Sequence, residues 1–233
     1  CDPDLRSFNK SIKKFKKKDI NVNVGLLHNK ITSFYSSYLL QKKNDLPFVT
    51  CKLAVSRDFY TINKKKKWIT NLYSRSRVHL MRSYHDCLIT SSKTIIKDNP
   101  HLTCRINGLN DRNPTRIVLD NKLKINLKSN ILNDKYKSKT IIFYNKNKSK
   151  KIKKIRDKGV KTHYIELDID GNLDLVKVLK KAKALGFSRV FLEAGLNLSI
   201  NFFKKNLIND FKIFISNKYL KKSGSNSIKN LYH

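Results

Sequence analysis

The sequence predicts an α/β protein in which a sheet is flanked by helices. Short runs of β-branched and aromatic residues recur along the chain, and segments with helical spacing separate them. A chain of 233 residues is long enough for one domain with a substantial core, or for one domain with an appendage. The expected strands of the sheet are residues 48–55, 87–89, 115–119, 140–144, 162–167, 189–192 and 211–215.

The first 45 residues carry too few apolar side chains to fold alone, so we expect them to pack on another surface. Residues 2–4 supply cap chemistry, and apolar residues from Leu5 to Phe15 recur at helical spacing. Ile20 to Val24 alternate as a short strand that Gly25 ends, and residues 31–40 again have helical spacing.

Lys52 stands in the middle of the first long apolar strand, Phe48 to Val55. A buried charge must be paired or must reach a cavity, because burying it alone costs several kcal/mol. Lys52 is therefore a candidate catalytic residue, although an edge position with the ammonium reaching solvent explains it equally well. The single tryptophan, Trp68, follows a basic loop. We expect it to be a core anchor, with a flat wall for a ring-containing ligand as the alternative.

A helix is expected over residues 71–84, and Arg82 near its end can cap carbonyls or reach a ligand. The next strand, from Cys87, leads into the hydroxyl cluster Thr90, Ser91, Ser92 and Thr94. We expect a polar loop there, then a second β-rich pair at residues 95–96, with Pro100 fixing the exit. Arg105 closes the stretch with a fork suited to phosphate, but spacing alone fits an ordinary connection equally well.

In the second half, a helix over Leu173 to Leu185 ends at Gly186. The turn Glu193-Ala194-Gly195 leads into a helix over residues 197–205, whose free amides attract anions. Only one glycine is present, so a dinucleotide fingerprint of the GxGxxG type is disfavoured. Glu193 can bond a substrate hydroxyl or amine, or simply cap the helix.

Composition sets further limits. The formal net charge of +34 fits either a nucleic-acid binder or a solvated lysine-rich surface. The lysines are spread over every element and are not interleaved with aromatic residues, so we expect weak, salt-sensitive binding and no specific nucleic-acid partner. The four cysteines form no CxxC pair, which implies free thiols and no zinc site. No stretch is long enough for a membrane span and no signal peptide is visible, so a cytoplasmic protein is expected.

Five short segments, taken in order, resemble the reductase domain of the bifunctional riboflavin-biosynthesis deaminase–reductase. That family has K-x-A-x-S-L-D-G, S-x-W-I-T-S, T-x-x-x-D-D-P-x-L-T-x-R, R-I-V-L-D-S and V-E-G/A-G. This chain has matching segments at residues 52–58, 68–71, 94–105, 116–121 and 192–195. The resemblance covers about residues 47–220, and residues 2–40 are similar to the tail of the family's deaminase half.

The chain departs from the family at several positions. Phe59 replaces the glycine of S-L-D-G, Lys66 replaces the serine before the tryptophan, and Asn121 replaces the serine after R-I-V-L-D. The zinc deaminase motifs, H-x-E and P-C-x-x-C, are absent. We expect residues 1–45 to be the tail of a deaminase domain that is otherwise missing. Residues 46–233 are expected to form a reductase domain truncated at its C-terminus, with the sheet lacking an edge or completed by a partner.

The resemblance implies a dihydrofolate-reductase-like mixed sheet, NADPH as cofactor and a phosphoribosylamino-pyrimidine substrate whose ribosyl group is reduced to ribityl. Zinc is implied only for the absent deaminase domain, and a homo-oligomer is expected. Lys52 and Glu193 are the candidates for proton transfer. The implied NADPH-binding residues are Ala54, Trp68, Thr94, Asp98, Asn121, Gly195, Leu196, Asn197, Leu198, Ser199, Ile200 and Asn201. The implied substrate-binding residues are Lys66, Arg82, Leu102, Arg105 and Glu193. The alternatives are a basic nucleic-acid-binding protein and a catalytically degenerate homologue.

Overall fold

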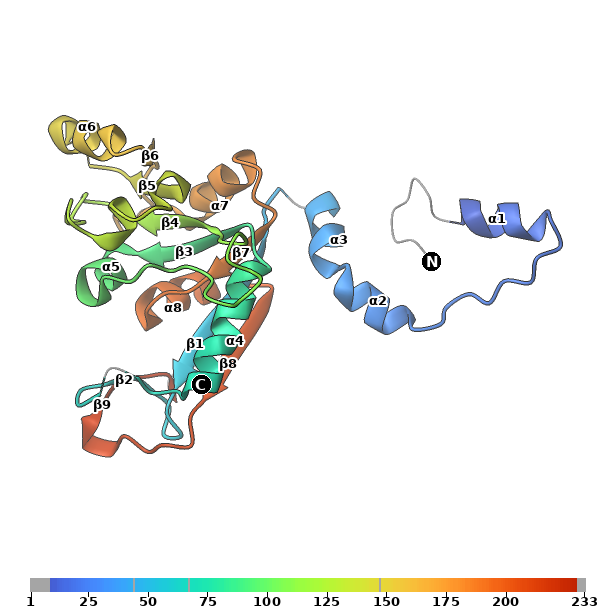
Figure 1. Cartoon of the computed structure of the whole chain (residues 1–233), viewed down its shortest axis with the longest axis horizontal. Helices are drawn as coiled ribbons and strands as arrows, with labels where there is room; N and C mark the ends of the chain where they lie inside the picture. The colour runs from blue at the N-terminus through green and yellow to red at the C-terminus, as the bar shows by residue number, and fades with distance from the viewer. Residues whose placement is uncertain (1–8, 44, 67, 147, 230–233) are drawn as a thin grey trace.

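A seven-stranded sheet forms the centre of the molecule (Figure 1) in a computed structural model that describes residues 9–43, 45–66, 68–146 and 148–229. Its strands are β1 (Phe48–Val55), β3 (Cys87–Ser91), β4 (Thr115–Leu119), β5 (Thr140–Tyr144), β6 (Lys161–Tyr164), β7 (Arg189–Leu192) and β8 (Asp210–Ile215). Their order is β6-β5-β4-β3-β7-β1-β8, and each pair of neighbours is parallel. The strands expected from the sequence are therefore present, with ends shifted by up to three residues.

Helices cover both faces of this sheet, which explains why its strands are apolar on both sides. In β3, Cys87 and Ile89 face one core cluster and Leu88 faces the other. The cluster on the Leu88 side receives α4 (Leu72–Ser83), α5 (Ser92–Asp98) and α6 (Ser149–Asp157). The opposite cluster receives α7 (Leu175–Ala184) and α8 (Leu196–Lys204).

A second, two-stranded sheet adds the antiparallel pairing of the fold. It joins β2 (Tyr60–Asn63) to β9 (Gly224–Ser227), so the described C-terminal residues return to the turn after β1. Strands β6 and β8 form the two edges of the large sheet. Short 3₁₀ turns complete the secondary structure: η1 (Asn130–Leu132), η2 (Lys137–Lys139) and η3 (Lys221–Ser223).

The buried Arg116 ties the connections around β4 to the sheet. Its guanidinium forms a two-pronged ion pair with Asp134, at 2.6 and 2.9 Å, and donates to the Thr140 hydroxyl. It also donates to the His101 carbonyl at 2.8 Å, and so holds the segment that follows α5. Removing one partner of such a pair leaves an uncompensated charge, at a cost of about 3–5 kcal/mol.

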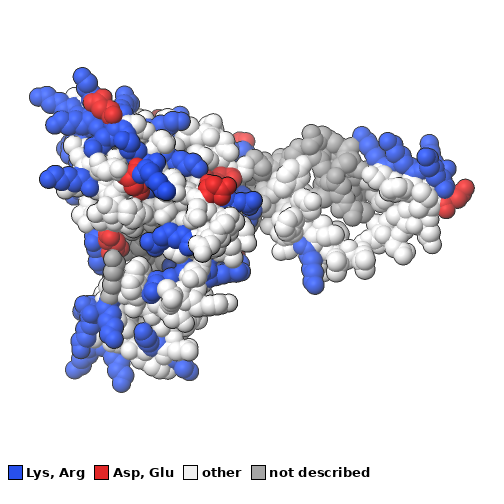
Figure 2. All heavy atoms as spheres, viewed as in Figure 1, with Lys and Arg blue, Asp and Glu red and all other residues white. Residues whose placement is uncertain are grey.

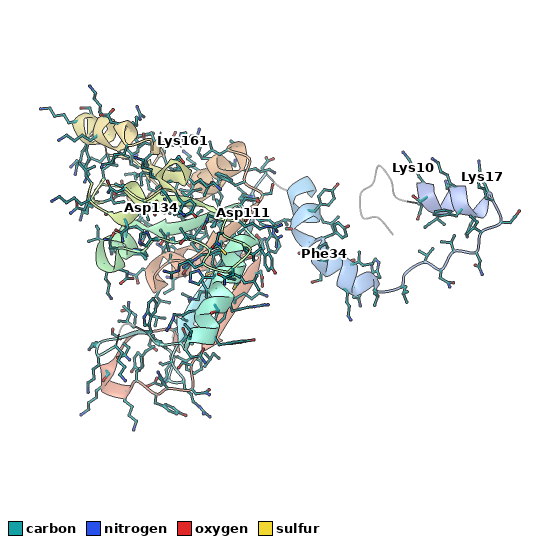
Figure 3. All side chains as sticks on the ribbon, viewed as in Figure 1. Lys10, Lys17, Phe34, Asp111, Asp134 and Lys161 are labelled. Atoms are coloured by element: carbon teal, nitrogen blue, oxygen red, sulfur yellow. The ribbon has the colours of Figure 1, made fainter. Side chains whose placement is uncertain are left out.

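Helices α1 (Lys10–Lys16), α2 (His28–Phe34) and α3 (Ser36–Lys43) form an arm that extends away from the sheet (Figures 1 and 3). Neither α1 nor α2 buries a residue, and Phe34 is 80% exposed. These two helices form no core of their own, as expected, but within the described residues they also bury no side chain against another surface, which differs from the expectation. The capping residues 2–4, Leu5 and Phe8 lie outside the described residues.

Two local expectations were wrong. Ile20 to Val24 form no strand, because no other segment among the described residues pairs with them. The hydroxyl cluster after β3 is not a loop, because the Ser91 side chain caps α5 by accepting from the Thr94 amide at 3.4 Å. The pair at residues 95–96 is accordingly helical, with Ile95 buried against the sheet and Ile96 half-exposed.

The three cysteines within the described residues, Cys51, Cys87 and Cys104, are buried free thiols, as expected. No helix in the described part of the chain has both the length and the apolar character needed to cross a membrane.

Candidate functional site

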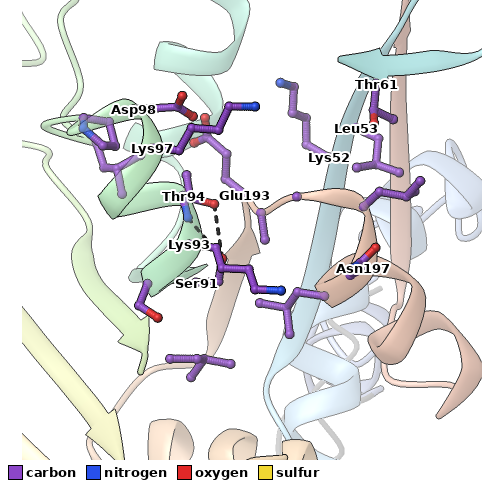
Figure 4. A pocket seen from close by; sticks show the side chains of 18 of the residues that line it. Lys52, Leu53, Thr61, Ser91, Lys93, Thr94, Lys97, Asp98, Glu193 and Asn197 are labelled. Carbon is purple, nitrogen blue, oxygen red and sulfur yellow. Dashed lines mark hydrogen bonds between the residues drawn. The ribbon is translucent and has the colours of Figure 1, made fainter. Parts of the chain in front are cut away.

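A cleft of about 1800 Å³ lies at the carboxyl ends of the central strands. The neighbours β3 and β7 lead into helices on opposite faces of the sheet, α5 and α8. Such a point of divergence in a parallel sheet is where ligands usually bind. Both the segment from Thr94 to Arg105 and the turn at Gly195 line this cleft (Figure 4).

The wall on the α5 side combines hydroxyl groups with a constrained backbone. The Ser91 and Thr94 hydroxyls lie 3.2 Å apart at the helix start (Figure 4). Beyond the helix, Asn99 and the buried Leu102 adopt left-handed conformations, with φ of 40° and 55°. A leucine in this region is strained, and such strain persists where surrounding structure fixes the backbone. These two residues therefore fix the course of the backbone between Asp98 and Arg105.

The wall on the α8 side is the start of a nine-residue helix. Gly195 occupies the N-cap position, and no side chain caps the first turn. The free amides and the helix dipole favour an anionic group at this end of the cleft. Gly195, Leu196 and Asn197 all line the cleft there.

Three charged side chains meet between the two walls. The Arg82 guanidinium holds Glu193 with two hydrogen bonds, of 2.8 Å from Nε and 2.7 Å from Nη2. Lys52 enters from β1 and its Nζ lies 5.8 Å from the centre of the Phe214 ring. Figure 4 shows Lys52 and Glu193 reaching into the same space from neighbouring strands. Lys52 was expected to be paired or to reach a cavity, and its side chain reaches the cleft.

The surroundings of Glu193 and Lys52 shift the pKa values of both side chains. Burial raises the pKa of the Glu193 carboxyl, but the charge and hydrogen bonds of Arg82, with help from Lys52, outweigh burial and leave that pKa below its ordinary value. Burial lowers the pKa of the Lys52 ammonium; Glu193 opposes this shift and Arg82 adds to it. Glu193 is therefore an ionised carboxylate at neutral pH, and Lys52 gives up its proton more readily than an exposed lysine.

His79, which the sequence reasoning missed, shares a hydrogen-bond partner with Arg82. His79 lies one turn earlier on α4, on the same helix face. Its Nδ1 is 2.9 Å from the Thr103 carbonyl, which also accepts from Arg82 Nη1 at 2.8 Å. Its Nε2 is 3.1 Å from Arg105 Nη2. The i, i+3 spacing to Arg82 was the only sequence signal for His79.

Trp68 is not a core anchor. Its side chain is 52% exposed, lines the cleft and stacks under the Arg75 guanidinium at 4.9 Å. Its exposure and its place in the cleft lining fit the flat-wall alternative.

The cleft brings together most of the residues expected to bind ligands. Ser199 and Ile200 do not line it, since Ser199 is buried under the first turn of α8 and Ile200 packs beside Leu196. Lys66 does not line it either, and lies in an exposed turn that Asn63 caps. The predicted residues that line the cleft are Lys52, Ala54, Trp68, Arg82, Thr94, Asp98, Leu102, Arg105, Asn121, Glu193, Gly195, Leu196, Asn197, Leu198 and Asn201.

Within the described residues, no group of three or more His, Cys, Asp or Glu side chains is placed to hold a metal ion. The walls of the cleft carry an ionised carboxylate, a half-buried lysine, arginine forks and helix-start amides.

Comparison with known proteins identifies the family. Residues 47–225 match the family model described as the RibD C-terminal domain. The chain belongs to that family. The riboflavin biosynthesis protein RibD of Aquifex aeolicus is 28% identical over 221 residues, which cover 94% of this chain and 60% of the relative. The chain spans about three fifths of the length of the curated RibD relatives that it matches first.

Solved RibD structures share the fold. Acinetobacter baumannii RibD superposes with a TM-score of 0.74 at 23% identity, covering 93% of this chain and 59% of that protein. The riboflavin biosynthesis reductase Rib7 of Saccharomyces cerevisiae superposes with a TM-score of 0.66 at 21% identity, covering 84% of this chain and 87% of that protein. The RibD C-terminal domain of this chain therefore has the expected dihydrofolate-reductase-like α/β fold.

Proposed function

We propose that this RibD C-terminal domain reduces the ribosyl group of 5-amino-6-(5-phosphoribosylamino)uracil to the ribityl form, with NADPH as reductant. Family membership over residues 47–225 supports this function, as do the names of the RibD relatives. The observation that carries the proposal is one cleft with a helix start on one wall and Arg105 on the other. A sugar phosphate and a dinucleotide pyrophosphate are anions that these two features suit.

The cleft suits a nicotinamide dinucleotide on two grounds. Its volume of about 1800 Å³ exceeds the roughly 300–1,000 Å³ typical of a single-ligand pocket, which leaves room for two ligands side by side. The uncapped α8 amides fit the pyrophosphate, and the exposed face of Trp68 fits a ring. When bound, the reduced nicotinamide would supply the hydride. The preference for NADPH over NADH is part of the proposal.

Lys52 is the proposed proton donor. The reaction breaks the ribose C1′–O4′ bond, adds a hydride to C1′ and places one proton on O4′, so one hydride and one proton are consumed. Glu193 is ionised and cannot donate that proton, whereas the lowered pKa of Lys52 suits a donor. Glu193 is proposed to accept a hydrogen bond from a substrate hydroxyl or amine, in an orientation that Arg82 sets.

The first test replaces Lys52 by methionine, which keeps the length of the side chain and removes the ammonium. We expect kcat to fall about 100-fold or more, because general acid catalysis contributes about 10²–10⁴. NADPH affinity should be unchanged. The measurement is NADPH oxidation by the purified full chain with the pyrimidine substrate, with Lys150→Ala on α6 as the control. Wild-type protein that neither binds nor oxidises NADPH would reject the proposed function.

The second test assigns the phosphate. Arg105→Ala should raise the KM for the substrate about tenfold to a hundredfold, as expected for losing charge-assisted hydrogen bonds of about 1.5–3 kcal/mol. NADPH affinity, measured by calorimetry, should change far less. Arg112→Ala is the control, since Arg112 is an exposed arginine of the same connection that does not line the cleft. Equal losses for both ligands would reject the phosphate role of Arg105.

The division of the chain is also a proposal. We assign the reductase to residues 46–233, and the prediction that residues 1–45 are the tail of a zinc-dependent deaminase domain stays a prediction. The high net charge raises a nucleic-acid-binding function as a competitor, which a salt titration described below addresses.

A further inference from the structure

His79 connects two of the arginines that line the cleft, Arg82 and Arg105. Its side chain is half-buried on α4 and lines the cleft with Arg82 and Arg105. Arg105 Nη2 lies 3.1 Å and Nε 3.4 Å from His79 Nε2. On the other side of the ring, Nδ1 lies 2.9 Å from the Thr103 carbonyl and 3.3 Å from Arg82 Nη1.

These contacts define the state of the imidazole. The shorter Nδ1 contact is to a carbonyl oxygen, which accepts and cannot donate, and Arg82 Nη1 itself donates to that carbonyl at 2.8 Å, so we assign the proton to Nδ1. The guanidinium of Arg105 can only donate, so Nε2 must offer its lone pair. The ring is therefore neutral. Burial and the charge of Arg82 lower the pKa of His79 and favour this neutral form, as does Arg105, while the Thr103 hydrogen bond and Glu193 oppose them.

The geometry has a consequence for Arg105. Arginine carries about 2 kcal/mol of rotamer entropy, and the Arg105 side chain is exposed. His79 engages the Nε and Nη2 edge, while Nη1 makes no hydrogen bond to any residue that the structure describes. The second edge of the fork is thus held ready beside the cleft before a ligand arrives.

We propose that His79 is a positioning residue, whose neutral Nε2 fixes the Arg105 guanidinium to receive the phosphate monoester of a sugar phosphate. The inference deepens the function proposed above and rests on it for the identity of the substrate. Arg82 has a different role from Arg105, because its guanidinium is engaged by Glu193 and the Thr103 carbonyl.

The test is a double-mutant cycle on the full chain, with ribose 5-phosphate as the probe and calorimetry as the measurement. We expect His79→Ala to weaken binding about threefold to tenfold, the effect of losing one pre-ordered side chain. Arg105→Ala should weaken it further, and His79→Ala should add nothing in the Arg105→Ala background, because His79 acts through Arg105. His79→Gln keeps an acceptor near the Nε2 position and should recover part of the affinity.

Additive losses in the cycle, or no rescue by glutamine, would overturn the inference. So would wild-type protein that binds no ribose 5-phosphate, or a His79→Ala loss shared equally by NADPH, which indicates a general structural role. The probe needs no turnover, so these outcomes are separate from failure of the proposed reduction, which NADPH oxidation by the wild type decides. With the true substrate, His79→Ala should raise KM and leave kcat unchanged.

Discussion

At the scale of single residues, Phe59 occupies the turn position at which the S-L-D-G pattern has glycine. Its φ of 66° is left-handed, so the backbone keeps the conformation that glycine favours although a large side chain stands there. Such a conformation costs an L-residue about 1–2 kcal/mol. Packing of the ring beside Leu53, Val55, Leu196 and Ile228 opposes that cost. The departure therefore leaves the turn in place.

A pair of substitutions isolates the strain. We expect Phe59→Gly to be more stable than Phe59→Ala by about 1 kcal/mol, since both lose the ring but only glycine relaxes the backbone. Urea denaturation of the two variants measures the difference. On α6, Lys153→Ala should instead be more stable than Lys153→Gly by about 1 kcal/mol. Alanine and glycine of equal stability at position 59 would contradict a strained turn.

At the scale of elements, Asp58 joins the turn after β1 to the segment before β9. Its carboxylate accepts from the Ser56 hydroxyl at 2.6 Å and from the amides of Leu220 at 3.0 Å and Lys221 at 2.7 Å. Partial burial raises the pKa of Asp58, but these hydrogen bonds outweigh it and lower the pKa from 3.8 to about 2. Asp58 thus fastens the two-stranded sheet, whose residues Thr61, Ile62 and Asn226 line the cleft.

This pKa predicts a pH dependence. A carboxyl whose folded pKa lies below its unfolded value contributes stability above the unfolded pKa and loses it as pH falls through the folded pKa. We expect wild-type stability to fall relative to Asp58→Asn between pH 3.8 and about 2, measured by denaturation at several pH values. Asp111→Asn, at an exposed turn, is the control. A difference between wild type and Asp58→Asn that stays constant over that window would contradict the assignment.

The arrangement of α5 shows how one residue decides an element. Hydroxyl residues after an apolar run suit a loop as well as a helix start, and only the contact of Ser91 with the Thr94 amide distinguishes the two. Once the helix forms, Ile95 is directed to the core and Lys97 and Asp98 to the cleft. The position of this wall therefore depends on a helix cap.

At the scale of the whole molecule, the charge is spread widely rather than gathered at the cleft. Figure 2 shows Lys and Arg side chains over α6 and around the two-stranded sheet, with few acidic side chains among them. The net charge of +34 makes long-range attraction to any polyanion unavoidable at low salt. The cleft itself holds an ionised carboxylate, Glu193, which suits a specific ligand better than a nucleic-acid backbone.

A salt titration separates the two functions. We expect affinity for random-sequence duplex DNA to fall by about 10³ or more between roughly 50 and 200 mM salt, as for binding by counterion release alone. Polyglutamate, an anionic polymer without bases, should bind with a similar salt dependence. Sub-micromolar DNA affinity that persists at physiological salt, without matching affinity for polyglutamate, would favour the nucleic-acid function over the reductase.

Much of the fold could be predicted from local sequence. The apolar runs located the strands because a strand buried on both faces must be apolar throughout, and Gly186 located the end of α7. The helix starts at Leu175, two residues after the expected start, because the Asp174 side chain caps it there. The strand predicted at residues 20–24 was wrong, because alternating apolar residues form a strand only where a partner strand can pair with them. Trp68 misled because a large aromatic side chain suits a core and a ligand wall equally well.

By itself, the sequence determined where the strands lie, which family motifs they carry and how strongly positive the surface is, because these follow from neighbouring residues and from composition. Only the tertiary structure decided that Arg82 holds Glu193, 111 positions away, and that His79 holds Arg105. It also decided that β7 lies between β3 and β1, which opens the cleft. These contacts join residues distant along the chain, and local patterns carry no information on which distant partner a side chain meets.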